Sequence, residues 1–81
     1  MKPVIEGLLF LVGEEGIDVK TISNILEIEE KEVIQILEEL FKDYQNSERG
    51  LTIKNLGGLF KLTTKKQHKK YYTKLEIFDI V

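Results

Sequence analysis

The spacing of apolar residues changes near residue 50, and this change limits the possible folds more than any other feature of the sequence. Before it, apolar residues recur every three or four positions, which is typical of helices packed on one side. After it, residues 51–54 and 60–63 alternate apolar with polar side chains, as half-buried strands do. Gly57 and Gly58 lie between the two runs and can supply the positive φ angles of a tight turn. The sequence therefore predicts helices followed by a β-hairpin.

Three helical segments precede the hairpin. Residues 4–12 are apolar at seven of nine positions, so we expect a helix buried on more than one side, ended by the glycines and acids of residues 13–16. Asp18 is placed to cap a short second helix over residues 19–26. A third helix, from about residue 30 to 45, is indicated by apolar residues at helical spacing: Val33, Ile36, Leu37, Leu40 and Tyr44.

The predicted order of elements indicates a fold class. Residues 65–75 regain a helical pattern, with Thr64 as the expected cap. Three helices with a tight joint between the second and third, then a hairpin and a C-terminal helix, describe an α+β, mostly α, winged helix-turn-helix. We expect residues 1–76 to form this winged-helix domain, and the apolar residues 77–81 to begin a connection to a second winged-helix domain that is absent from this chain.

Composition restricts the setting of the domain. A chain of 81 residues supports one core. It contains no cysteine, so it forms no disulfide, thiolate nucleophile or zinc ribbon, and the cytoplasm is the expected location. The apolar N-terminal run is much shorter than the roughly 20 residues that cross a bilayer. It also contains Glu6 and lacks a small-residue cleavage site, which argues against a signal peptide.

Charge is distributed unevenly along the chain. Residues 1–40 hold three lysines and ten acids, a net charge of −7, whereas residues 41–81 hold nine cations and four acids, a net charge of +5. The predicted third helix, which reads the major groove in DNA-binding winged helices, is rich in glutamate. Acids beside phosphates oppose binding, so we expect no sequence-specific reading of DNA. A DNA-binding transcriptional regulator domain remains the alternative.

Four lysines form a basic cluster that would serve that alternative. Lys65, Lys66, Lys69 and Lys70 are the candidate contacts for an anion or a nucleic acid. The plainer interpretation is a solvated helix face. His68, the sole histidine, is expected to be exposed.

Two apolar groups are candidates for contacts between proteins. The first helix has more apolar residues than one face can hide, and Leu8, Leu11 and Val12 are the candidates for a dimer contact there. Leu56 and Leu59 flank the glycine turn, where a side chain reaches its own core poorly. The alternatives are that the helix residues are all core, and that Leu59 folds back against the hairpin.

The sequence offers no set of residues for catalysis. It has no cysteine and no phosphate-binding glycine loop of the P-loop pattern, and its single histidine has no acid at ligand spacing. We therefore expect a protein that is not an enzyme and that uses no cofactor, metal or small-molecule substrate.

Two segments in this order resemble a known family. Residues 5–10 read Ile-Glu-Gly-Leu-Leu-Phe, and residues 57–65 read Gly-Gly-Leu-Phe-Lys-Leu-Thr-Thr-Lys. With the acidic helix pair between them, they resemble the N-terminal winged-helix domain of segregation and condensation protein B. The resemblance implies a homodimeric accessory subunit that binds a kleisin, segregation and condensation protein A, and through it the SMC ATPase, in chromosome condensation and segregation. It also implies that this domain dimerises but binds the kleisin poorly alone.

Overall fold

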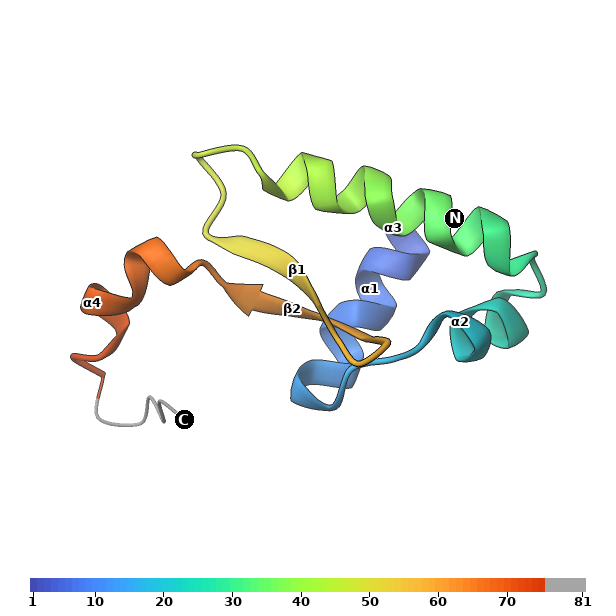
Figure 1. The fold of residues 1–81 in the computed structure, drawn as a ribbon, viewed down its shortest axis with the longest axis horizontal. Helices are drawn as coiled ribbons and strands as arrows, with labels where there is room; N and C mark the ends of the chain where they lie inside the picture. Colours follow the sequence, from blue (N-terminus) through green and yellow to red (C-terminus); the bar gives the residue numbers. More distant parts are fainter. Residues whose placement is uncertain (76–81) are drawn as a thin grey trace.

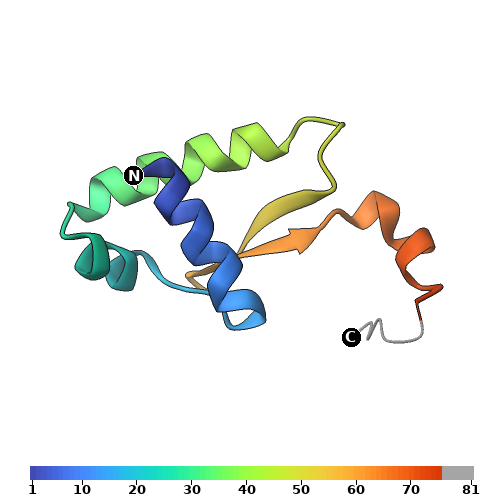
Figure 2. The ribbon, with the colours of Figure 1, turned by 180° about the vertical axis from the view of Figure 1, so that it is seen from behind.

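The computed structural model describes residues 1–75 and shows a winged helix. Figure 1 shows α3 along one side of the molecule and the hairpin beside it, while Figure 2 shows α1 crossing on the opposite side. The predicted fold class is therefore confirmed. The elements in chain order are α1 (Lys2–Val12), η1 (Gly13–Glu15), α2 (Val19–Leu26), α3 (Glu30–Tyr44), β1 (Leu51–Leu56), β2 (Leu59–Thr64), η2 (Lys66–His68) and α4 (Lys69–Tyr72).

Local signals set the ends of α2. The carboxylate of Asp18 accepts a hydrogen bond from the backbone N–H of Thr21 at 2.8 Å, as predicted for an N-cap. The hydrogen bonds from Thr21 hold the pKa of Asp18 below its ordinary value. At the other end Glu27 takes a left-handed conformation, with φ of 55°, which ends α2 and turns the chain into α3.

The hairpin forms at the predicted place and gains a partner that the sequence did not indicate. Gly57 and Gly58, with φ of 60° and 91°, make the turn. Ile17, between α1 and α2, exchanges backbone hydrogen bonds of 2.9 and 2.8 Å with Phe60 of β2. Gly16 permits this approach, because a Cβ there would lie 3.1 Å from the Phe60 carbonyl oxygen. The chain after α1 thus fastens the wing to the helices.

The core lies between the three helices and the inner face of the hairpin. The prediction that the first helix is buried on more than one side is wrong. Only Ile5 and Leu9 of α1 are buried, whereas Phe10 and Leu11 are 73% and 78% exposed. α3 and β2 pack on one side of α1, and the described residues leave Val4, Phe10 and Leu11 exposed on the other. The full set of buried apolar residues is Ile5, Leu9, Ile17, Ile22, Val33, Leu37, Leu40 and Ile53.

The C-terminal helix is shorter than predicted and begins differently. The chain forms the single turn of η2 and then α4, with Lys65 at the first N-cap position and no side-chain cap. Thr64 ends β2 opposite Leu51 instead of capping a helix. The pairing of β1 with β2 continues to Thr64, so the backbone of this residue belongs to the sheet. The predicted connection at residues 77–81 lies outside the described residues, so that domain boundary stays a prediction.

Candidate protein-interaction surfaces

The charged side chains of α1 are directed toward α3. The ammonium of Lys2 lies 2.7 Å from the Asp43 carboxylate and 3.8 Å from that of Glu39. The hydroxyl of Tyr44 donates a hydrogen bond to the Glu6 carboxylate. The hydrogen bond to Asp43 raises the pKa of Lys2. The hydrogen bond to Glu6 and, as a smaller cause, partial burial raise the pKa of Tyr44. The opposite side of α1 is left without charge.

The uncharged side of α1 forms a continuous apolar strip. Successive residues of a helix turn by about 100°, so the positions opposite the buried Ile5 and Leu9 share one face. Figure 2 views the molecule from the side on which α1 crosses. Scattered exposed apolar residues are ordinary, but a contiguous patch marks an interaction site. We call this strip the outer face of α1 and define it as Pro3, Val4, Gly7, Phe10 and Leu11.

Gly7 lies at the centre of the outer face. A Cβ built at this position would meet nothing within 4 Å, so the fold itself does not require glycine there. Glycine in the middle of a helix lowers helix stability relative to alanine. Its effect on the surface is to leave the backbone of α1 open to close approach by another chain.

The outer face includes only part of the predicted dimer set. Leu11 is on it and is almost fully exposed. Leu8 and Val12 are half-buried at its edge and pack against the core. The sequence-based set missed Val4 and Phe10. Plotting α1 as a helix with Ile5 and Leu9 on the inside would have found them.

The wing tip carries the other predicted pair. Leu56 and Leu59 face each other across the turn, and both are exposed. Leu59 therefore does not fold back into the hairpin. The backbone near Leu59 lies against Gly16, which places the tip beside η1. The structure leaves this pair available for contact, and its role in a dimer stays a prediction.

A groove between α3 and the hairpin was not predicted. It has a volume of about 330 Å³ and an apolar lining. Leu37 and Ile53 are buried at its floor, while Ile34 and Phe41 of α3 rise at 46% and 45% exposure. In the sequence, Ile34 and Phe41 only widen the apolar side of this helix and give no sign of a second wall. We call this feature, lined by Ile34, Leu37, Phe41, Ile53, Asn55 and Phe60 with Glu38 and Lys42, the α3–hairpin groove.

The predicted basic cluster is divided by the fold. Lys65 is buried, and its ammonium donates a hydrogen bond to the Asn46 carbonyl at 2.7 Å. The ammonium of Lys70 lies 5.2 Å from the ring centroid of Tyr71. Residue 68 also departs from expectation, since His68 is half-buried and packs edge to face with Tyr72.

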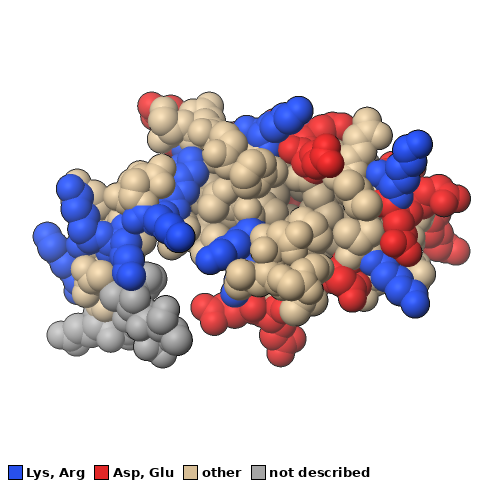
Figure 3. All heavy atoms as spheres, in the orientation of Figure 1, with Lys and Arg blue, Asp and Glu red and all other residues tan. Residues whose placement is uncertain are grey.

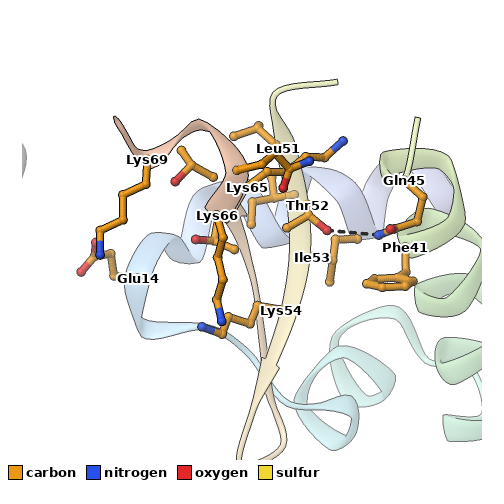
Figure 4. A pocket seen from close by; sticks show the side chains of 14 residues that line it. Glu14, Phe41, Gln45, Leu51, Thr52, Ile53, Lys54, Lys65, Lys66 and Lys69 are labelled. Atoms are coloured by element: carbon orange, nitrogen blue, oxygen red, sulfur yellow. Dashed lines mark hydrogen bonds between the residues drawn. The ribbon is translucent and has the colours of Figure 1, made fainter. Parts of the chain in front are cut away.

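The remaining lysines of the cluster border an open hollow at the base of the hairpin. Figure 4 shows Lys66 and Lys69 there with Lys54, which comes from β1 and was missed in the sequence. Glu14 lies on the same rim and adds a negative charge. Lys65 lines the hollow as well, but its ammonium is held at the Asn46 carbonyl, so the three other lysines remain beside one carboxylate.

The charge asymmetry of the sequence persists in the folded domain. Figure 3 shows Lys and Arg predominating around α4 and Asp and Glu predominating around the joint of α2 and α3, with charges of both signs on the surface between them. The acidic end is the start of α3, where Glu29, Glu30 and Glu32 lie exposed. A duplex approached by this helix would meet those carboxylates first.

Two negative findings concern the part of the chain that the structure describes. Within residues 1–75 no group of three metal-binding side chains comes together. None of the helices over the same residues has the length and apolar character needed to span a membrane.

Comparison with known families gives a match over most of the chain. A family model described as segregation and condensation complex subunit ScpB matches residues 3–77. Segregation and condensation protein B of Bacillus cereus strain AH187 is 49% identical over 74 residues, and the protein of the same name from Bacillus anthracis strain CDC 684 is equally similar. The match covers 91% of this chain and 39% of each relative, so the chain spans about two fifths of their length.

Two solved structures share the fold. One is a dimer of an ScpB N-terminal domain complexed with an ScpA peptide; it is 40% identical, with a TM-score of 0.90, and the match covers 99% of this chain and 92% of that one. The other is ScpB from Mycobacterium tuberculosis, 18% identical, with a TM-score of 0.82 over 99% of this chain and 52% of that one. The second likeness concerns the fold alone.

Proposed function

Because this chain belongs to the family of segregation and condensation complex subunit ScpB, we propose that it is the dimer-forming N-terminal domain of a chromosome segregation and condensation subunit. It catalyses no reaction in this role. It pairs with a second copy of itself and binds a segment of the kleisin-type subunit ScpA, and through ScpA it acts with the SMC ATPase. Its place is the cytoplasm, at the nucleoid. The dimeric, peptide-bound state of the similar solved domain supports both contacts.

The observation that carries this proposal is the outer face of α1. It is exposed, apolar and free of charge, because Lys2 and Glu6 are held on the α3 side. In a two-fold dimer each residue near the axis meets the same residue of the other copy, so a charge there would repel itself. Two antiparallel α1 helices crossing at Gly7 would bury Phe10 and Leu11 of both copies.

The contact with ScpA is proposed for this domain by itself. The family resemblance led us to expect weak binding by an isolated N-terminal domain. The similar solved N-terminal domain, however, is complexed with an ScpA peptide, and that domain extends little beyond the region it shares with this chain. We therefore infer that residues 1–75 contain a surface for an ScpA segment.

Sedimentation equilibrium over a wide concentration range tests the proposal, with and without a short random-sequence duplex at low salt. We expect a concentration-dependent dimer that leaves the duplex free. Leu11→Glu should raise the dissociation constant at least about thirtyfold, as loss of a central interface residue does. Ile25→Glu is the matched control, since Ile25 is an exposed aliphatic residue on α2, away from the outer face.

One result would replace the proposal with the alternative. A monomer that binds the duplex and releases it as salt rises would identify the domain as a DNA-binding regulator. The hollow bordered by Lys54, Lys66 and Lys69 would then be the site, and Lys66→Glu should weaken the binding.

A further inference from the structure

The α3–hairpin groove is an apolar concavity that the dimer contact does not use. It lies between α3 and the hairpin, whereas Figures 1 and 2 show α1 crossing on the other side of the molecule. Its floor is part of the core, so its shape is set by the packing of α3 on β1 rather than by mobile side chains. Apolar grooves of about 300 Å³ or more are typical of binding sites.

The walls of the groove hold apolar surface that a partner could bury. Ile34 and Phe41 stand about half exposed on one wall, and Phe60 is half-buried on the other. The side-chain oxygen of Asn55 accepts a hydrogen bond from the backbone N–H of Gly58 at 2.8 Å, so this polar wall residue is already engaged in the hairpin turn. A ligand therefore meets mainly hydrocarbon along the length of the groove.

The rim of the groove carries two opposite charges one helical turn apart. Glu38 and Lys42 both border it, and the ion pairs within residues 1–75 involve Lys2 rather than either of them. Four residues separate them, the spacing at which helix side chains are neighbours. A partner helix lying along α3 with a basic residue near Glu38 and an acidic residue near Lys42 would complement this order.

The length of the groove indicates how much of a helix it holds. Ile34 and Phe41 are seven residues apart on α3, about 10 Å at 1.5 Å per residue. That distance matches two turns of a helix, which present apolar anchors at positions i, i+3 or i+4, and i+7.

We propose that the α3–hairpin groove binds two turns of an amphipathic helix from ScpA, with aliphatic or aromatic anchors toward Phe41 and Ile34 and a basic residue at Glu38. The identity of the partner rests on the proposed function, and the chemistry of the site rests on the groove. The occupant is a different protein and not a second copy, because a hollow placed against an identical hollow across a two-fold axis stays unfilled, whereas a helix fills it. The peptide bound to the similar dimeric domain shows that such a domain accepts a dimer partner and a peptide together.

Binding of fluorescently labelled ScpA from the same organism to this chain tests the site by titration. Ile34→Lys and Phe41→Ser should each weaken binding at least about thirtyfold, since both remove a wall of the groove. Ile25→Lys, the same chemistry outside the groove, should leave it within about twofold. Glu38→Lys should weaken it by about threefold. The dimer, followed by sedimentation, should be unchanged in all four variants.

The outcomes separate this inference from the proposed function. If ScpA binds the unsubstituted chain and both groove variants equally well, the groove is not the site, although the domain is still an ScpA-binding module. If ScpA does not bind the unsubstituted chain, the proposed kleisin contact and the groove assignment fail together. Thermal melting is the control for folding. If Ile34→Lys and Phe41→Ser melt at the same temperature as Ile25→Lys, their weaker binding does not come from loss of the fold.

Discussion

The outer face of α1 and the α3–hairpin groove are both exposed apolar surfaces, but they differ in shape and charge. The first is the ridge of a helix with glycine at its centre and no charge, because Lys2 and Glu6 are turned to α3. The second is a hollow bordered by Glu38 and Lys42. An uncharged ridge suits an identical ridge across a two-fold axis, whereas a hollow does not fill an identical hollow and therefore suits a different partner. One small domain therefore offers two separate surfaces, and we propose the first for a copy of itself and the second for another protein.

The largest expected effect separates the inside of α1 from the outside. Leu9→Ala should lower the free energy of unfolding by about 2–5 kcal/mol, because it opens a cavity in the core. Leu11→Ala, two residues away on the outer face, should change it by less than about 0.5 kcal/mol. Urea unfolding at concentrations where the chain is monomeric measures both. Equal losses would mean that Leu11 belongs to the core of the monomer and that the outer face is wrongly assigned.

Gly7→Ala should act in opposite directions on the monomer and on the dimer. Alanine removes the cost of glycine in a helix, so the monomer should gain up to about 1 kcal/mol of stability, and no atom lies near enough to clash. The added methyl group separates two helices that cross at this point, so the dimer should dissociate more readily. Urea unfolding and sedimentation of the same protein check the two effects. A dimer as tight as before would place the crossing elsewhere.

Salt should distinguish the two surfaces by a smaller margin. Raising salt from about 0.05 M to about 0.5 M screens the rim charges of the groove and should weaken ScpA binding by a fewfold. The α1 dimer, which uses no charge, should keep its dissociation constant or tighten slightly. Sedimentation and fluorescence titration in the same buffers make the comparison. A dimer that weakens with salt more than ScpA binding does would reverse our assignment of the two surfaces.

The smallest effect concerns the hydrogen bond that joins α1 to α3. The pKa of Tyr44 is raised in the folded chain, so the folded state holds this proton more tightly than the unfolded state. Its contribution is complete below the ordinary pKa of about 10 and is lost as pH rises through the folded value. Above about pH 10, Tyr44→Phe should lose stability less steeply than the unsubstituted chain. Identical alkaline profiles would show that the bond to Glu6 adds nothing.

Much of the fold was predictable because its signals are local. The helical spacing of α3, the cap at Asp18 and the turn at Gly57 and Gly58 each depend on neighbours in sequence, and each was found where predicted. The C-terminal segment was predicted less well, because β2 extends to Thr64 and because Lys65 is drawn to the Asn46 carbonyl. Both causes are contacts between residues far apart in the chain.

The candidate surfaces divide in the same way. The excess of apolar residues in α1 predicted an interface, but not which residues face outward, and so Leu11 was predicted and Phe10 was not. The sequence contains no recognisable pattern for the groove, because its two walls come from segments about twenty residues apart.

By itself, the sequence determined the helices, the hairpin, the acidic start of α3 and the surplus of apolar residues in α1, because periodicity and turn chemistry act over a few residues. Only the tertiary structure decided that Ile17 pairs with Phe60, that Lys2 and Glu6 leave one side of α1 uncharged, and that Phe41 and Phe60 stand across a groove. These results depend on which elements pack together. Packing is a property of the whole chain, so a surface that binds a partner becomes visible only once the core has been assembled beneath it.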